Sequence, residues 1–167
     1  QRCDKPVVAG LNGVAAGAGM ALAMACDTRL AAESAWLFPG YSRIGGSPDG
    51  GLSWTLPQVV GYEKAMRFLL ENKRVDADEA LALGLIGEVV PDHQFQARFV
   101  EYCHSLTTIS PIAARLTKRV VREATKIDIE SQVRYELQTI GTAFASEDGK
   151  ESRRAFLERR TPKIQGR

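Results

Sequence analysis

The chain has 167 residues, of which 44% are hydrophobic and 25% are charged, a composition typical of one globular domain rather than of a disordered or fibrous protein. Its longest apolar run, residues 13–26, covers about 14 residues, whereas a helix that spans a bilayer needs roughly 20, so no membrane segment is expected. The net charge is only +2, which excludes neither an anionic nor a neutral partner.

The charge is unevenly distributed along the chain. Residues 150–167 carry seven basic and two acidic side chains, so this basic tail has a net charge of +5. A solvated helix face explains such a pattern. A surface for an anionic partner, such as a phosphate-bearing cofactor or a nucleic acid, explains it equally well. The sequence leaves both interpretations open.

Cysteine and histidine are too few and too scattered to form a recognisable site. Cys3, Cys26 and Cys103 are odd in number and lack the spacing of a disulfide framework or a zinc site. With no secretory signal pattern at the start, free thiols predict a cytoplasmic protein. His93 and His104 lie at opposite ends of an expected helix and supply neither a metal cluster nor a Ser-His pair. We therefore expect no metal site.

The first part of the chain reads as alternating strand and helix. Residues 6–12 are apolar with β-branched side chains and predict a buried strand. Residues 16–27, rich in Ala, Met and Leu and apolar on every face, predict a buried helix, and residues 28–34 a second strand. This order is typical of a right-handed βαβ unit with a parallel sheet. Glycine and proline are frequent in residues 35–51, which we interpret as a loop.

The remaining chain is predicted to be mainly helical. Helices are expected over residues 52–60, 63–71, 77–83, 92–108, 111–125, 129–145 and 148–158, with a small strand at 86–91. Gly84 ends the third of these helices, and Ser110 caps the fifth. No internal repeat or low-complexity linker separates domains, so residues 1–91 and 92–167 are predicted to be two lobes of one unit.

A glycine-rich turn opens the first helix. Gly17 and Gly19 match part of the dinucleotide-binding fingerprint, but its third glycine position holds Leu22. The same geometry suits an oxyanion hole, because the first turn of a helix leaves backbone N–H groups unpaired at the positive end of the helix dipole. Such donors stabilise an enolate by about 3–4 kcal/mol each. Close packing of helix on strand explains the same small residues.

One carboxylate, Asp49, stands alone in the stretch "IGGSPDGGLSW" at residues 44–54. Aspartate just before a helix is a good N-cap, worth about 1 kcal/mol. A carboxylate in a loop is also suited to carry a proton. Local sequence favours the cap and leaves the catalytic role open.

Three segments, taken in order, resemble the crotonase (enoyl-CoA hydratase/isomerase) superfamily. They are "KPVVAGLNGVAAGAGMALAMACDTRLAAESAWL", "RIGGSPDGGLSWTLPQVVGYEKAMRFLLENKRVDADEALALGLIGEVVP" and "AFLERRTPKIQG". The resemblance covers nearly the whole chain and lacks the family's N-terminal third. It implies an α/β fold with a ββα spiral core (residues 1–91) and a C-terminal helical trimerisation lobe (92–167), in a homotrimer or a dimer of trimers. The implied substrate is an acyl-CoA thioester, with no cofactor beyond the coenzyme A of the substrate.

The resemblance also assigns roles to the glycine-rich turn. Family members hold a thioester enolate between two backbone N–H groups, one of which would belong to Ala18, between Gly17 and Gly19. Hydratases of the family activate water with two glutamates, whose positions hold Ala21 and Tyr41 here. Alanine and a phenol with an ordinary pKa near 10 cannot form an acid–base pair, so conventional hydration is not expected.

Asp49 resembles the residue with which isomerase-type relatives carry a proton, and it also occupies the position of the nucleophile of 4-chlorobenzoyl-CoA dehalogenases. We expect an enoyl-CoA isomerase. The alternatives are a hydratase-like enzyme, a dehalogenase-like enzyme with nucleophilic Asp49, and a non-catalytic CoA-binding paralogue.

Tyr41 and Trp54 are candidate substrate contacts, although core packing also explains Trp54. Phe156 and Arg159 match family contacts to the CoA nucleotide, and nucleic acid is not expected as a partner.

Overall fold

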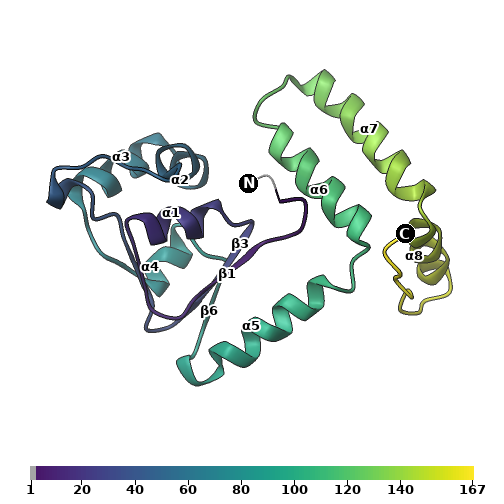
Figure 1. Ribbon diagram of the computed structural model, residues 1–167, viewed down its shortest axis with the longest axis horizontal. Helices are drawn as coiled ribbons and strands as arrows, with labels where there is room; N and C mark the ends of the chain where they lie inside the picture. The colour runs from purple at the N-terminus through teal and green to yellow at the C-terminus, as the bar shows by residue number, and fades with distance from the viewer. Residues whose placement is uncertain (1–2) are drawn as a thin grey trace. The chain divides into compact units, whose positions relative to one another are not determined.

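The computed structural model describes residues 3–167, which form two compact units (Figure 1). The first unit spans Val7–Glu101, and the second comprises residues 3–6 with Tyr102–Arg167. The division falls within helix α5 (Asp92–Leu106). The two lobes expected from the sequence, with their boundary near residue 91, stay a prediction.

Two three-stranded sheets form the first unit. One contains β1 (Val8–Leu11), β3 (Thr28–Ala32) and β6 (Glu88–Val90), all parallel. The other contains β2 (Val14–Ala16), β4 (Trp36–Phe38) and β5 (Val75–Asp76), with β2 parallel and β5 antiparallel to β4. The chain therefore contributes one strand to each sheet before each of its first two helices: β1 and β2 precede the first, and β3 and β4 precede the second. This is the ββα spiral that the resemblance predicted.

The sequence pattern missed β2 and β4. A loop was predicted over residues 35–51, where the structure has β4, and one strand followed by a turn was predicted where β1 and β2 stand. Both predictions are wrong in this respect. Each missed strand has only three residues, too few for alternation of apolar and polar side chains to be visible. Their pairing, Val14 with Trp36 through Ala16 with Phe38, is a long-range contact that local patterns do not encode.

The helices of the first unit agree with the predictions apart from their ends. They are α1 (Ala18–Ala25), α2 (Leu52–Val60), α3 (Tyr62–Glu71), α4 (Ala77–Ala82) and α5, with a 3-10 turn η1 (Ser42–Ile44). Gly84, with a φ of 76°, follows the end of α4 as expected. Helix α1 was expected to be buried on every face, but Leu22 on its outer side is 71% exposed.

The core of the first unit lies where the helices pack on the sheets. Its most deeply buried large side chains are Met20, Leu30, Leu37, Leu52, Leu56 and Leu85, each 2% exposed or less. Burying a side chain of this size contributes about 1.5–3 kcal/mol. Helix α1 packs on β2 and on α2. This packing fixes the position of the turns that precede both helices.

Three helices make up most of the second unit: α6 (Pro111–Glu123), α7 (Ile129–Ala145) and α8 (Glu147–Leu157). Figure 1 shows α6 and α7 side by side. Asp128 caps α7 by accepting the Ser131 N–H, and Ser146 caps α8 by accepting the Gly149 N–H. Ser110 precedes α6 as expected, but its side chain makes no cap, because the hydroxyl faces the Asp148 carboxylate at 3.5 Å.

Asp148 ties the end of the chain to α8. The helix was predicted to begin at Asp148 but begins one residue earlier, and the Asp148 carboxylate is 1% exposed. It accepts the backbone N–H groups of Gln165 at 2.7 Å and Gly166 at 2.8 Å, and the Asp148 N–H donates to the Arg167 carbonyl. Because a buried carboxylate needs such partners, this contact fixes the C-terminal segment.

The described residues contain no helix suited to span a membrane and no disulfide. None of the helices within residues 3–167 combines the length and the apolar character that crossing a membrane requires. Cys3, Cys26 and Cys103 are all free thiols.

Substitution by alanine is expected to have opposite effects at two glycines in the helices of the second unit. A Cβ atom at Gly149 would overlap the Ala143 carbonyl oxygen, whereas a Cβ atom at Gly141 would meet nothing within 4 Å. Gly149→Ala is therefore expected to destabilise the protein by about 1–3 kcal/mol, because backbone must move. Gly141→Ala is expected to stabilise it by about 0.5–1 kcal/mol, because alanine restricts the unfolded chain. Urea-unfolding midpoints of both variants measure this, and equal effects would contradict the packing described at Gly149.

Candidate functional site

The turn between β2 and α1 is held by the neighbouring strand. Gly17 has φ 51° and ψ −119°, a conformation that only glycine adopts without strain. Its N–H donates to the Phe38 carbonyl of β4 at 3.0 Å, which adds one hydrogen bond to the ladder after the pairing of Ala16 with Phe38. The Gly17 carbonyl accepts the Ala21 N–H, so the helix starts directly at the sheet.

The first turn of α1 presents unpaired donors. Within residues 3–167, the N–H groups of Ala18 and Gly19 have no acceptor, and no side chain caps this helix. Both residues are exposed and small. Since the positive end of the helix dipole lies here, the turn can bind an oxygen on which negative charge develops. The role of the Ala18 N–H as an oxyanion donor stays a prediction.

Asp49 does not cap helix α2, so that interpretation is wrong. The N-cap residue is Gly51, and no side chain caps the helix. Gly50 and Gly51 both have positive φ, 58° and 84°, and they turn the chain between Asp49 and the helix. The Asp49 carboxylate instead accepts the Tyr41 hydroxyl at 2.8 Å. Two residues selected from the sequence thus lie in direct contact.

Ala21 lies against the same loop. It is 1% exposed, and a Cβ atom on Gly50 would stand 2.8 Å from the Ala21 Cβ. The backbone that follows Asp49 therefore fills the space in front of Ala21, one helical turn after Ala18. The structure brings together the glycine-rich turn, position 21, Tyr41 and Asp49 within the first unit.

Tyr41 is a buried hydrogen-bond donor. Its side chain is only 8% exposed, and burial raises the pKa of Tyr41 above its ordinary value. The hydrogen bond to the Asp49 carboxylate raises this pKa further. The phenol therefore keeps its proton at neutral pH and donates a hydrogen bond to the Asp49 carboxylate.

Asn72 is a residue of this region that the sequence analysis missed. It ends helix α3 with a φ of 55°, is 6% exposed, and accepts the Gly40 N–H on its side-chain oxygen at 2.8 Å. Asparagine is one of the few residues other than glycine that adopt this backbone conformation readily. The one signal in the sequence was that Asn72 directly follows an expected helix, residues 63–71. Asn72 holds the residue just before Tyr41.

Trp54 lies in the first turn of α2 and is half exposed, so core packing does not explain it within the described residues. Its side chain stands three residues beyond Gly51, on the helix that follows Asp49. A role in substrate contact stays a prediction.

Phe156 and Arg159 belong to the second unit. Phe156 is 81% exposed and lines an open apolar groove of 390 Å³ with Phe144 and Leu157. Arg159 follows the end of α8 with a φ of 54°. The expected contacts of Phe156 and Arg159 with a nucleotide stay a prediction.

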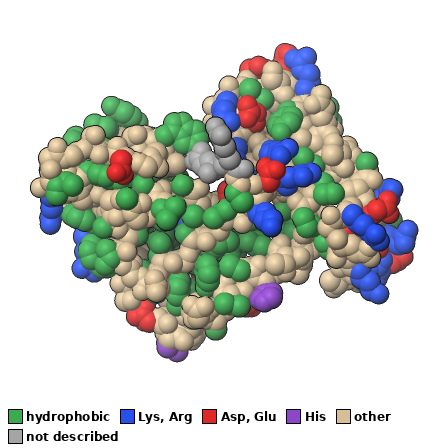
Figure 2. Space-filling model, in the orientation of Figure 1, with side chains coloured by type: hydrophobic (Ala, Val, Ile, Leu, Met, Phe, Trp, Pro, Cys, Tyr) green, Lys and Arg blue, Asp and Glu red, His purple; other side chains and the backbone are tan. Residues whose placement is uncertain are grey.

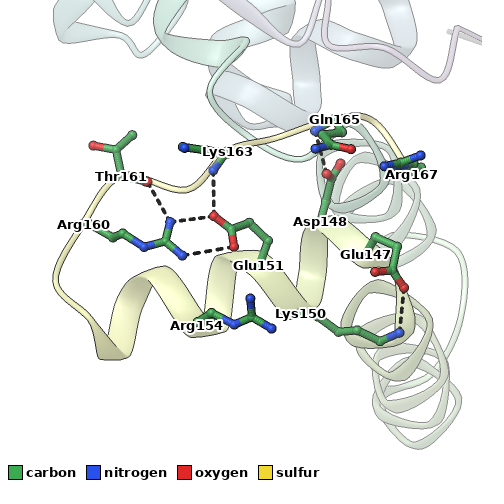
Figure 3. Close-up of a pocket in the computed structure, with 10 residues that line it drawn as sticks. All are labelled: Glu147, Asp148, Lys150, Glu151, Arg154, Arg160, Thr161, Lys163, Gln165 and Arg167. Carbon is green, nitrogen blue, oxygen red and sulfur yellow. Dashed lines mark hydrogen bonds and ion pairs between the residues drawn. The ribbon is translucent and has the colours of Figure 1, made fainter.

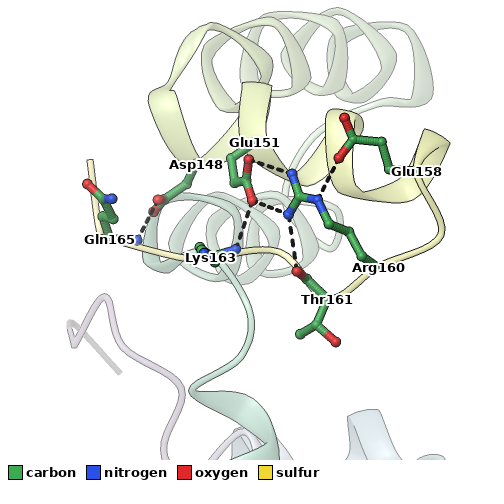
Figure 4. Close-up of polar contacts among 7 residues, drawn as sticks. All are labelled: Asp148, Glu151, Glu158, Arg160, Thr161, Lys163 and Gln165. Carbon is green, nitrogen blue, oxygen red and sulfur yellow. Dashed lines mark hydrogen bonds and ion pairs between the residues drawn. The ribbon is translucent and has the colours of Figure 1, made fainter.

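The basic tail is partly balanced by its own carboxylates, and Figure 2 shows basic and acidic side chains interleaved at this end of the chain. Arg160 lies 2.6 Å from Glu151 and 2.6 Å from Glu158 (Figure 4). The Arg160 guanidinium, with the Lys163 backbone N–H, lowers the pKa of Glu151 to about 2. Glu151, Arg160 and Asp148 are among the residues that line an open pocket of 570 Å³ (Figure 3). The pairing supports the solvated-face interpretation for Arg160, and an anionic partner stays a prediction.

No group of three or more His, Cys, Asp or Glu side chains in the described part of the chain is arranged to hold a metal ion.

The contact between Tyr41 and Asp49 predicts a measurable titration. Asp49→Asn is expected to lower the pKa of Tyr41, because the neighbouring negative charge is removed, but to leave it above the ordinary value, because burial remains the larger cause. NMR titration with ¹³Cζ-labelled tyrosine measures this, with the Tyr41 signal assigned by Tyr41→Phe. Asp78→Asn, an exposed change on α4, serves as the control. An unchanged Tyr41 titration in Asp49→Asn would contradict the hydrogen bond.

Known proteins match the chain over its whole length. Residues 1–167 match the family model described as enoyl-CoA hydratase/isomerase. The probable enoyl-CoA hydratase of Rhodobacter capsulatus is 37% identical over 165 residues, which are 99% of this chain and 64% of that protein. The 1,2-epoxyphenylacetyl-CoA isomerase of Escherichia coli is 34% identical over 166 residues, 99% of this chain and 63% of that protein.

Solved structures agree with the sequence comparisons. The crystal structure of enoyl-CoA hydratase from Bacillus anthracis superposes with a TM-score of 0.95 at 32% identity, covering 99% of this chain and 64% of that one. The chain thus spans just under two thirds of the length of these relatives. The α/β fold, the ββα order and the extent of the match show that the chain belongs to the enoyl-CoA hydratase/isomerase family.

Proposed function

We propose that the full-length protein acts on acyl-CoA thioesters and moves a carbon–carbon double bond, as an enoyl-CoA isomerase. The observation that carries this proposal is the Asp49 carboxylate, which accepts the Tyr41 hydroxyl and precedes Gly50, the residue that packs against Ala21 of α1. The family resemblance gives Ala21 and Tyr41 the two positions of the hydratase glutamates. Moving a double bond needs one group that takes and returns a proton, whereas hydration by the family's mechanism needs two carboxylates.

The proposed reaction uses Asp49 twice. Its carboxylate removes a proton from C2 of a 3-enoyl thioester, and the electron pair of that bond enters a dienolate whose negative charge lies largely on the thioester oxygen. The Ala18 N–H donates to this oxygen. Protonated Asp49 then returns the proton to C4, which gives the 2-enoyl thioester and restores the carboxylate. No other reactant is consumed.

The names of the relatives agree that the substrate is a CoA thioester, but they differ in the reaction that is catalysed. The relative from Rhodobacter capsulatus carries a hydratase name and the one from Escherichia coli an isomerase name acting on 1,2-epoxyphenylacetyl-CoA. Both names include a CoA thioester. The choice of isomerase over hydratase rests on the side chains at positions 21, 41 and 49.

The other parts of the proposal follow from family membership. Phe156 and Arg159 contact the CoA nucleotide, because an exposed aromatic ring stacks on a base and a guanidinium pairs with phosphate. Gly17 and Gly19 admit the thioester group close to the backbone, and Trp54 contacts the acyl chain. The protein works as a homotrimer or a dimer of trimers in the cytoplasm, without a cofactor of its own.

The role of Asp49 is tested by removing its charge in the full-length protein. Asp49→Asn is expected to lower kcat for conversion of 3-enoyl-CoA to 2-enoyl-CoA by about 10²- to 10⁴-fold, because amide cannot take the proton. Acyl-CoA affinity, measured by calorimetry, stays within about twofold, since the thioester is held by the backbone. Asp78→Asn should leave both values unchanged. Equal loss of binding and turnover in Asp49→Asn would remove the catalytic role.

Other outcomes separate the alternatives. A covalent ester on Asp49, found by mass spectrometry after incubation with an aryl- or acyl-CoA, identifies a dehalogenase-like nucleophile instead. Hydration of a 2-enoyl-CoA that survives in Asp49→Asn identifies a hydratase-like enzyme. Binding of CoA thioesters with no turnover of 2-enoyl or 3-enoyl substrates identifies a non-catalytic paralogue.

The oxyanion donor is tested with proline. Ala18 is the first residue of α1, a position where proline fits a helix but supplies no N–H. Ala18→Pro is expected to lower kcat by about 10²- to 10³-fold, the cost of one lost oxyanion donor. Ala18→Gly retains the N–H and is expected to keep kcat within about threefold, since the side chain itself does not act. Circular dichroism checks that both variants fold, and equal kcat values in the two folded variants would exclude Ala18 as a donor.

A further inference from the structure

The Tyr41 side chain is anchored more firmly than its place in a loop suggests. The N–H of the preceding Gly40 donates to the Asn72 side chain at 2.8 Å. The Tyr41 carbonyl accepts two N–H groups, from Ile44 at 3.1 Å and from Gly46 at 2.9 Å. With 8% of the residue exposed, the phenol is also packed on most sides. Its hydroxyl therefore has a fixed position.

Asp49 has no comparable support. It is exposed and lies in an irregular segment, residues 46–49, followed by two glycines with positive φ. Its carbonyl accepts the Leu52 N–H, which holds the backbone but not the side chain. Among residues 3–167, the Tyr41 hydroxyl is the one hydrogen-bond partner of the Asp49 carboxylate, at 2.8 Å to Oδ1. The direction of the carboxylate thus depends on Tyr41.

We infer that Tyr41 is the positioning residue of Asp49: its hydroxyl holds Oδ1, so that Oδ2 alone takes the proton from C2 and returns it at C4. This inference rests on the proposed function and names a residue for that reaction. A carboxylate free to rotate would present either oxygen in many directions. Fixing one oxygen keeps the other within reach of both carbon atoms, which is how orientation lowers a barrier.

Tyr41 is not itself the proton carrier. Burial and the neighbouring carboxylate both raise the pKa of Tyr41, so the phenol is a weaker acid than usual. Loss of its proton would leave a phenolate 2.8 Å from a carboxylate, and like charges at this distance repel strongly. The phenol keeps its proton throughout the reaction and acts through Asp49.

Kinetics of the full-length protein give the first test. Tyr41→Phe removes only the hydroxyl group and is expected to lower kcat for double-bond migration by about 10- to 100-fold, the effect of losing one hydrogen bond to a charged group. KM should stay within about twofold. Tyr62→Phe is the matched control, because Tyr62 is 74% exposed on α3, and it should leave both constants unchanged. A higher KM with unchanged kcat would make Tyr41 a substrate contact and overturn the inference.

A second measurement does not need turnover. The neighbouring carboxylate raises the pKa of Tyr41, so the ¹³Cζ titration of Tyr41 should move to lower pH in Asp49→Asn and not in Asp78→Asn. If the wild-type protein isomerises nothing but the Tyr41 titration moves, the proposed function fails while the contact between Tyr41 and Asp49 stands. If the wild-type protein isomerises, Tyr41→Phe leaves kcat unchanged and Asp49→Asn leaves the Tyr41 titration unchanged, the inference fails while the proposed function stands.

Discussion

The hydrogen bond from the Gly17 N–H to the Phe38 carbonyl is the contact on which the candidate site depends. It continues the pairing of β2 with β4 by one residue and so starts helix α1 at the edge of the sheet. Phe38 is also the last residue of β4, after which the chain enters the loop that carries Tyr41 and Asp49. One backbone contact thus connects the unpaired N–H groups of α1 with the carboxylate loop. Only glycine adopts the φ and ψ of residue 17 without strain, so this geometry depends on the sequence at a single position.

The sequence predicted the helices well because each carries a local signal. Asp128 before α7 and Gly84 after α4 are examples, since a cap and a left-handed glycine act within a few residues. Strands β2 and β4 carry no such signal, because three residues show no periodicity and their stability comes from pairing with each other. Asp148 illustrates the same limit in the second unit. Its position in the first turn of a helix was predictable, but its burial against Gln165 and Gly166 is a contact between distant residues.

For the candidate site, the sequence selected several residues but did not predict the contacts between them. Family resemblance selected Ala18, Tyr41 and Asp49, while local chemistry favoured Asp49 as a helix cap. The cap fails because Gly50 and Gly51 both adopt positive φ, which makes Gly51 the N-cap and leaves the carboxylate free to meet Tyr41. A contact between residues eight positions apart in an irregular segment follows no helical or strand period. For the same reason Asn72, which holds Gly40 from the end of another helix, was not selected.

The single carboxylate of the site also follows from packing. Gly50 approaches Ala21 so closely that a Cβ atom on Gly50 would stand 2.8 Å from the Ala21 Cβ. A glutamate at position 21 would have to displace the backbone that follows Asp49, because Ala21 is buried against Gly50. Alanine at 21, glycine at 50 and aspartate at 49 are therefore mutually consistent, and together they favour chemistry that needs one carboxylate steadied by a phenol over chemistry that needs two.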